Sequence, residues 1–279
     1  MRGTGEGIVG PPPRGQWLEH AAALTLAVLW VLPLAYAVWA AFHPPEYATR
    51  FSLFAPFSLE NFRRALAVAP FARYILNTMA LVTLVLAAQL VLCTLAAYAF
   101  ARYTFPGKGA LFALVLVQIL IMPEILLVEN YVTLSRLDLV DTLAGVGLPY
   151  MASAFGIFLL RQSFKQVPRD LEDAAQVEGA GPLRTLWSVY VPLARPTYLA
   201  YGLVSVSYHW NNFLWPLVVT NSVETRPITV GLGIFAAPET GVNWSVISAA
   251  TLTSVAPLLL AFLLFQRQFV QSFIRAGIK

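Results

Sequence analysis

One polar segment stands out in an otherwise apolar chain: Pro168–Pro192, which reads PRDLEDAAQVEGAGPLRTLWSVYVP. A helix is expected to begin just after Pro168, with Asp170 as its N-cap. Small and apolar residues recur at helical spacing on one face of this helix, at Leu171, Ala174 and Ala175. Gly179 is expected to end it, because glycine readily takes the left-handed conformation that follows a helix.

A second short helix is expected over Leu183–Tyr190. The turn Gly181-Pro182 would begin it, and the prolines of Val191-Pro192 and Arg195-Pro196 would end it. Two such helices at about a right angle would form a protruding foot (residues 168–192), whose alanines let another protein approach closely. The same residues also suit a loop that merely connects two membrane spans, and composition alone does not separate these two interpretations.

The composition of the whole chain indicates a membrane protein. Of the 279 residues, 58% are hydrophobic and 11% are charged, which excludes a soluble globular domain and a disordered chain. The one cysteine excludes an internal disulfide framework, and the three widely spaced histidines form no metal-ligand pattern. The net charge of +4 is spread over several loops, so nucleic-acid binding is not indicated.

Six stretches are long and apolar enough to cross a bilayer as helices, which predicts an all-α integral membrane protein. In the third, Pro123 is expected to kink or end the helix, which leaves Glu124 and Glu129 near the membrane surface. The six stretches are Trp17–Phe42, Tyr74–Ala101, Gly109–Leu134, Thr142–Leu160, Pro196–Thr220 and Ser245–Gln266.

The distribution of Lys and Arg predicts that both termini are cytoplasmic. With the N-terminus inside, twelve of the 18 basic residues fall in inner segments and six in outer loops. The first span is expected to be retained, although Ala35-Tyr36-Ala37 resembles a signal-peptide cleavage site. Residues 1–16 are expected to be a disordered cytoplasmic tail, followed by one transmembrane permease domain over residues 17–279.

The foot resembles the "EAA" loop of the permease subunits of bacterial ATP-binding cassette (ABC) importers. The family pattern is Glu-Ala-Ala, three residues, Gly, nine residues and Ile-x-Leu-Pro. This chain keeps that spacing with Asp173-Ala174-Ala175, Gly179, Val189 and Val191-Pro192. Asp173 takes the place of the usual glutamate, which leaves open whether Asp173 or Glu172 makes the contact that the family makes.

Other segments extend the resemblance over nearly the whole chain, to the carbohydrate-uptake branch and its maltose-type second-permease class. Some of them are most similar to the permease of glycerol-3-phosphate importers. The segments that carry these likenesses are Ser58–Phe62, Ala97–Arg102, Phe105–Lys108, Met122–Glu124, Met151–Ala154, Phe158–Gln162, Trp210–Pro216 and Gln266–Val270.

The resemblance implies a type I ABC importer permease fold with six transmembrane helices and a cytoplasmic coupling loop (residues 161–195). It implies four kinds of partner: a second homologous permease, two ATP-binding subunits, an extracytoplasmic substrate-binding protein and membrane lipid. ATP and Mg would be bound by the partner subunits, and this chain would bind no cofactor. The solute would be an oligosaccharide, glycerol-3-phosphate or a glycerophosphodiester. The chain would couple to the ATPase through the Asp170–Tyr190 segment. The residues expected to couple to the ATPase are Glu172, Asp173, Ala174, Ala175, Glu178, Gly179, Ala180, Pro182 and Pro192.

The residues themselves agree with a non-enzymatic subunit. The chain has no Gly-x-x-x-x-Gly-Lys-Ser/Thr loop and no visible catalytic grouping. Two other classes stay open on the residues alone. A secondary transporter would need coupling carboxylates inside its spans, where only Glu124 and Glu129 come near. A membrane-embedded enzyme would need a catalytic constellation, for which there is no candidate.

A substrate path is expected along the fifth span, where polar and aromatic side chains alternate. Amides and aromatic faces suit a sugar or polyol, since they offer hydrogen bonds and stacking. The alternative is that these groups join helices to one another. The candidates are Tyr208, His209, Asn211, Asn212 and Trp215, with Asn77, Gln89 and Gln118 as weaker ones.

Overall fold

The computed structural model describes residues 14–48, 50, 52, 54–236 and 243–277, and the side chains of most of them. The expected tail over residues 1–16 lies largely outside these ranges, and residues 14–16 begin the first helix. Every regular element in the described ranges is helical. The elements are α1 (Arg14–Ala41), α2 (Pro45–Ala48), α3 (Glu60–Val68), α4 (Phe71–Arg102), α5 (Lys108–Leu120), η1 (Pro123–Leu126), α6 (Leu127–Arg136), α7 (Leu143–Gly147), η2 (Leu148–Tyr150), α8 (Ala154–Lys165), α9 (Arg169–Val177), α10 (Pro182–Thr185), η3 (Leu186–Tyr190), α11 (Val191–Leu193), α12 (Arg195–Asn211), α13 (Leu214–Val219), α14 (Ile228–Leu232), η4 (Gly233–Ala236) and α15 (Trp244–Gly277).

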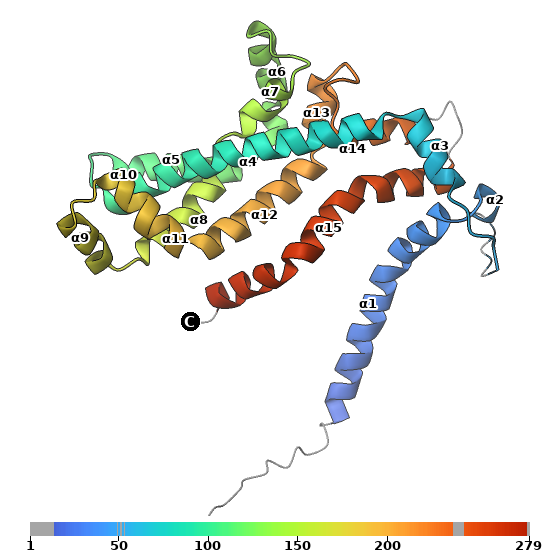
Figure 1. Ribbon diagram of the computed structural model, residues 1–279, viewed down its shortest axis with the longest axis horizontal. Coiled ribbons are helices and arrows are strands. Elements are labelled where there is room, and N and C mark those ends of the chain that lie inside the picture. The colour runs from blue at the N-terminus through green and yellow to red at the C-terminus, as the bar shows by residue number, and fades with distance from the viewer. Residues whose placement is uncertain (1–13, 49, 51, 53, 237–242, 278–279) are drawn as a thin grey trace, which may run out of the picture.

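The long helix α4 is the axis of the bundle. It packs against α8, α12, α7 and α14, and α12 in turn packs against α15. Figure 1 shows α9 at one end of α4 and α3 at the other, and we call these the foot end and the far end. Buried apolar side chains form three clusters, one near each end of α4 and one where α7 and α13 meet its middle.

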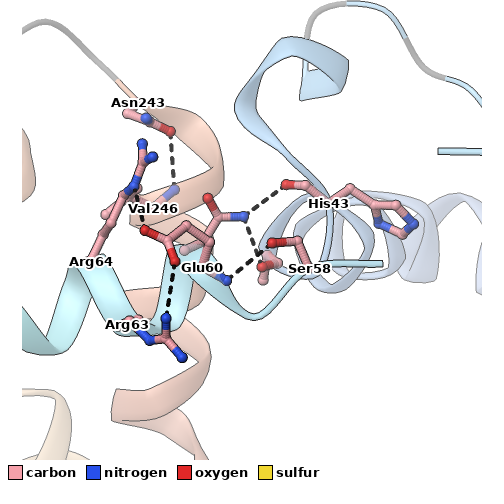
Figure 2. A network of polar contacts seen from close by, with 9 residues as sticks. His43, Ser58, Glu60, Arg63, Arg64, Asn243 and Val246 are labelled. Atoms are coloured by element: carbon pink, nitrogen blue, oxygen red, sulfur yellow. Dashed lines mark hydrogen bonds and ion pairs between the residues drawn. The ribbon is translucent and has the colours of Figure 1, made fainter. Parts of the chain in front are cut away.

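The first helix, α1, diverges from the bundle toward its N-terminus (Figure 1). Ala40 and Ala41 at its C-terminal end are buried, whereas its earlier residues are largely exposed. The buried side chain of Asn61 on α3 holds this end, because its Nδ2 donates to the carbonyl oxygens of Ala41 at 3.0 Å and of His43 at 2.7 Å. Figure 2 shows this junction, in which Glu60 of α3 also pairs with exposed arginines of its own helix.

Two loops at the top of Figure 1 are tied together by one carboxylate. Oδ1 of Asp141, which precedes α7, accepts hydrogen bonds from the backbone N–H of Asn221 at 2.8 Å and of Ser222 at 3.0 Å, and from the Thr225 hydroxyl. The loop that follows α13 is also held to α4, since Nδ2 of Asn77 donates to the carbonyl oxygen of Glu224 at 2.8 Å. Asn77 thus has a structural partner at the far end of the bundle.

The expectation of six continuous spans is only partly met. Three described helices are long and apolar enough to cross a membrane: Trp17–Ala41, Phe71–Arg102 and Trp244–Leu264. Two bent pairs bring the number to five if each is one crossing. They are Lys108–Leu120 with Pro123–Arg136, bent by 93°, and Leu143–Tyr150 with Ala154–Lys165, bent by 49°.

The third expected span ends before Pro123, as its sequence predicts. The fourth and fifth expected spans are wrong as continuous helices. The fourth breaks before Ala154, where the hydroxyl of Ser153 caps α8 by accepting from the N–H of Gly156 at 3.2 Å. The fifth breaks after Asn211, and its 17-residue α12 is followed by the short α13. Apolar composition runs through each break, so hydropathy alone cannot locate these breaks.

Candidate functional site: the foot and the central cavity

The foot forms two helical segments, as expected, with different boundaries. The first, α9, begins at Arg169, and its N-cap position is Pro168, so the expectation that Asp170 is the N-cap is wrong. The second begins at Pro182, one residue earlier than predicted. Its helical backbone continues through the π-helical turn η3 into α11, so Pro192 lies inside a helical turn instead of ending the helix. A proline is tolerated there because it occupies the first turn of α11.

Gly179 ends α9 in the left-handed conformation, with φ of +78°. The backbone N–H of Ala180 then donates to the carbonyl oxygen of Ala175 at 2.9 Å, and the N–H of Gly179 donates to that of Gln176 at 2.9 Å. This is a Schellman-type ending, which satisfies carbonyls that the helix leaves free. A Cβ at Gly179 would meet no other atom within 4 Å, so glycine is required here by its backbone and not by crowding.

The outer surface of the foot is small, acidic and apolar. Asp173, Ala174 and Glu178 are exposed, while Ala175 and Ala180 are half-buried. Large apolar side chains lie beside them in solvent: Leu171, Val177, Leu183 and Trp187. An exposed apolar patch with small residues and a polar rim is typical of a surface that another protein covers.

Glu172, in contrast, turns toward the bundle. Its Oε2 accepts a hydrogen bond of 2.7 Å from the hydroxyl of Tyr190 and lies 3.5 Å from Nε of Arg102, the last residue of α4. The Arg102 guanidinium also lies over the Tyr190 ring, 4.8 Å from its centroid. Burial, with the hydrogen bond to Glu172, raises the pKa of Tyr190 well above its ordinary value, so its hydroxyl stays protonated as the donor. We call these three side chains the foot clamp.

Sequence reasoning missed two members of the foot clamp. Arg102 looks like an ordinary inner-surface arginine at the end of a span, and Tyr190 looks like one more aromatic residue of the loop. Their contact joins residues 88 positions apart (102 to 190), and nothing in the local pattern of either segment signals it. Pro182 and Pro192, predicted as coupling residues, lie in the helical segment that carries Tyr190.

An open cavity of about 530 Å³, which we call the central cavity, lies between α4, α5, α8 and α12, and several residues that line it, among them Leu114, Val204 and Tyr208, are exposed. Tyr208 and His209, two of the predicted path residues, line it. Asn212 and Trp215 line a much smaller neighbouring pocket together with Glu124. Asn211 lines neither of these pockets, and its Nδ2 donates to the carbonyl oxygen of Ser207 in its own helix at 2.8 Å.

Gln89, one of the weaker candidates, is the centre of the polar wall of this cavity. Its Nε2 donates to the carbonyl oxygen of Tyr150 at 2.7 Å and lies 3.2 Å from Nε2 of His209. Its Oε1 accepts from the Ser205 hydroxyl at 2.5 Å. A buried amide with all these partners fixes α4, η2 and α12 relative to one another.

The breaks in the expected spans adjoin these cavities. Ile121 and Pro123 at the first break and Ala152 and Ser153 at the second line the larger cavity. Asn212 at the third break lines the smaller one. Non-helical backbone at membrane depth is tolerated only where protein buries it or where it lines a cavity. The breaks and the cavities are therefore one feature of the bundle.

Trp215 makes a structural contact. Its Nε1 donates to the backbone carbonyl oxygen of Val146 at 3.0 Å, and its side chain is buried against α7. Gln118, another weaker candidate, lines the cavity, and its Oε1 accepts from the backbone N–H of Ala154 at 3.0 Å, which satisfies the start of α8. Both interactions join helices, as interhelical hydrogen bonds commonly do in membranes.

Comparison with known proteins matches both the sequence and the fold. The family model of binding-protein-dependent transport system inner membrane components matches residues 22–275. The sn-glycerol-3-phosphate transport system permease protein UgpE of Pectobacterium atrosepticum is 30% identical over 206 residues, which cover 74% of this chain and 73% of the relative. The arabinooligosaccharides transport system permease protein AraQ of Halalkalibacterium halodurans is 28% identical over 269 residues, which cover 94% of this chain and 96% of the relative.

Two solved structures share the fold. One chain of a bacterial ABC transporter involved in the import of the acidic polysaccharide alginate has a TM-score of 0.80 and 21% identity over 94% of this chain and all of that chain. A chain of the bacterial alginate ABC transporter in complex with its alginate pentasaccharide-bound periplasmic protein has a TM-score of 0.66 and 16% identity over 92% of this chain and 96% of that one. The chain belongs to the family of binding-protein-dependent transport system inner membrane components and is a permease subunit of an ABC importer.

Proposed function

We propose that this chain forms half of the translocation path of an importer for a sugar or polyol-phosphate-type solute, and that the foot couples it to ATP-binding subunits. The observation that carries the proposal is that α9 has one face bound to the bundle and another face exposed. The foot clamp fixes Glu172 to the bundle, while Asp173 and Ala174 on the same helix stay exposed beside large apolar side chains. A partner that grips the exposed face would therefore move α4 with it.

The proposed assembly contains a second homologous permease, two ATP-binding subunits and an extracytoplasmic substrate-binding protein. ATP and Mg²⁺ would be held by the ATP-binding subunits. The proposed topology has six crossings, with α12 and α13 together as the fifth, and places both termini and the foot in the cytoplasm. The relatives named for sn-glycerol-3-phosphate and for arabinooligosaccharides support this range of solutes.

Cysteine cross-linking tests the coupling role of the foot. The single native cysteine, Cys93, is buried, so an introduced cysteine is the reactive one. Ala174→Cys, on the exposed face of α9, should cross-link to an ATP-binding subunit in the intact complex. Arg64→Cys, exposed on α3 at the far end, is the matched control and should give no such product. Equal cross-linking at both positions, or none at Ala174→Cys, would contradict the proposed coupling.

Reporter fusions test the topology. A reporter fused after Lys279 should behave as cytoplasmic, and one placed within residues 221–226 should behave as external. A fusion after Lys279 that reports an external location would refute the proposed orientation of the chain.

A further inference from the structure

We infer that the central cavity selects an uncharged, polyhydroxylated solute, a neutral sugar or oligosaccharide, over a phosphorylated one. This inference rests on the proposed function, because it assigns the solute class to the path that the chain would form. Its volume of about 530 Å³ lies within the range of about 300–1,000 Å³ that is usual for small-molecule sites.

Within the described part of the chain, the residues that line the cavity provide no positive charge to bind a phosphate dianion. None of the described residues that line it is a lysine, arginine, aspartate or glutamate. The neighbouring pocket carries Glu124, whose carboxylate would repel an anion. A site that recognises phosphate needs arginine, lysine or a free helix N-terminus to offset the charge.

The one histidine in the wall does not supply the missing positive charge. The orientation of the Gln89 amide is set on both sides, because its Oε1 accepts from Ser205 and its Nε2 donates to the carbonyl oxygen of Tyr150. The same Nε2 faces Nε2 of His209 at 3.2 Å, so the imidazole nitrogen accepts a hydrogen bond and carries no proton. His209 in this arrangement is a neutral imidazole.

The start of the helix at the cavity also has few free donors for an anion. The N-terminus of α8 follows Ser153, and free N–H groups at such a terminus attract phosphate. Here the N–H of Ala154 donates to Oε1 of Gln118 at 3.0 Å, and the N–H of Gly156 donates to the Ser153 hydroxyl at 3.2 Å. Side chains of the protein thus already use donors that a phosphate would need.

The tyrosine of the wall that a solute can reach is Tyr208 on α12, which is half-exposed and lines the cavity. Its ring offers a face for stacking and its hydroxyl can donate or accept a hydrogen bond, which suits a sugar. The ring of Tyr201 also lines the cavity, but its hydroxyl is fully buried and packs against Gly156 of α8.

Protection of an introduced cysteine measures which solute enters this cavity. Val204 is half-exposed and lines the cavity. In the assembled importer, Val204→Cys is labelled with a thiol reagent in the presence of arabinotriose, maltotriose or sn-glycerol 3-phosphate at equal concentration. At least one neutral oligosaccharide should slow labelling about fivefold or more, and sn-glycerol 3-phosphate should leave it unchanged. Protection by sn-glycerol 3-phosphate, or by none of the three, would overturn the inference.

The proposed function is tested separately in the same preparation. If Ala174→Cys fails to cross-link to an ATP-binding subunit, the coupling role fails. If it does cross-link but neutral oligosaccharides give no protection of Val204→Cys, only the solute class fails.

Discussion

The hydroxyl of Tyr190 donates a 2.7 Å hydrogen bond to Oε2 of Glu172, and this contact holds the Glu172 side chain toward the bundle. Glu172 faces the end of α4, where Arg102 lies 3.5 Å away, and the next residue, Asp173, faces solvent. The neighbouring acids of the EAA-like segment thus have different surroundings, which predicts different roles for them.

Glu172→Gln should destabilise the protein by about 1–3 kcal/mol, because it weakens a charge-assisted hydrogen bond and leaves the Arg102 guanidinium largely buried without its counter-charge. Asp173→Asn should leave stability unchanged, since its side chain is exposed, and should reduce attachment of the ATP-binding subunits. Thermal unfolding and co-purification measure the two effects. The assignment is wrong if the two variants behave alike in both assays.

The residue at position 179 is constrained by its left-handed backbone conformation and not by neighbouring atoms. Gly179→Ala should cost about 1 kcal/mol or more, because φ is +78° and L-residues with a Cβ disfavour that region. Gly179→Asn should be milder, since asparagine tolerates the left-handed region. Gly179→Asp should stay in the membrane yet abolish uptake and loosen the ATP-binding subunits, because it alters the surface that they are proposed to contact.

Ala175→Trp is expected to act in the same way as Gly179→Asp, by blocking close approach to α9. Membrane content, uptake and co-purification are measured for both variants. Wild-type uptake with full co-purification in Gly179→Asp and Ala175→Trp would mean that the foot is only a connector.

Asp141 should stabilise its contact with the loop that follows α13 in a pH-dependent way. Burial alone would raise the pKa of its carboxyl, but hydrogen bonds from Thr225, Ser222 and Asn221 outweigh burial and hold the pKa well below its ordinary value. The stabilisation is therefore complete above the unfolded pKa, about 3.9, and is lost as pH falls from there toward the folded pKa. Asp141→Ala should lower the thermal midpoint at pH 6, and its difference from wild type should shrink below about pH 4. A constant difference across this range would contradict the prediction.

Trp215 and Asn211 were both predicted to line the path, and their contacts now predict different outcomes. Trp215→Phe should destabilise the protein by about 1 kcal/mol or more, since it leaves the buried carbonyl of Val146 without its donor. Asn211→Ala should leave assembly intact, because its exposed side chain bonds only within α12. Thermal stability and complex assembly are the measurements. Loss of assembly in Asn211→Ala with none in Trp215→Phe would reverse this assignment.

The foot was the part of the site most open to prediction. Its glycine, prolines and small residues act through local backbone geometry, which a sequence displays directly. Gly179 takes the left-handed conformation that its position after α9 predicts. The foot clamp was not predictable, because Arg102, Glu172 and Tyr190 come from two segments whose meeting depends on how α4 packs.

The cavity was less open to prediction than the foot, because it depends on helix breaks and on how distant helices pack. A hydropathy window averages over a break, so the ends of η2 and α12 have the composition of the middles of continuous spans. The sequence favours His209 over Gln89 as a path residue, because a lone amide in a long apolar helix resembles a simple helix–helix contact. Only the packing of α4 against α12 and η2 places Gln89 at the centre of the polar wall.

Uninterrupted α4 has a mechanical consequence. At about 1.5 Å per residue, its 32 residues form a strut of about 48 Å. Along it lie Asn77, which holds the loop that follows α13, Gln89 in the cavity wall, and Arg102 in the foot clamp. A rigid helix transmits a displacement of one end to the other end. A displacement of the foot should therefore move the cavity wall and the loop that follows α13 as one body, while the breaks between the shorter helices change their angles.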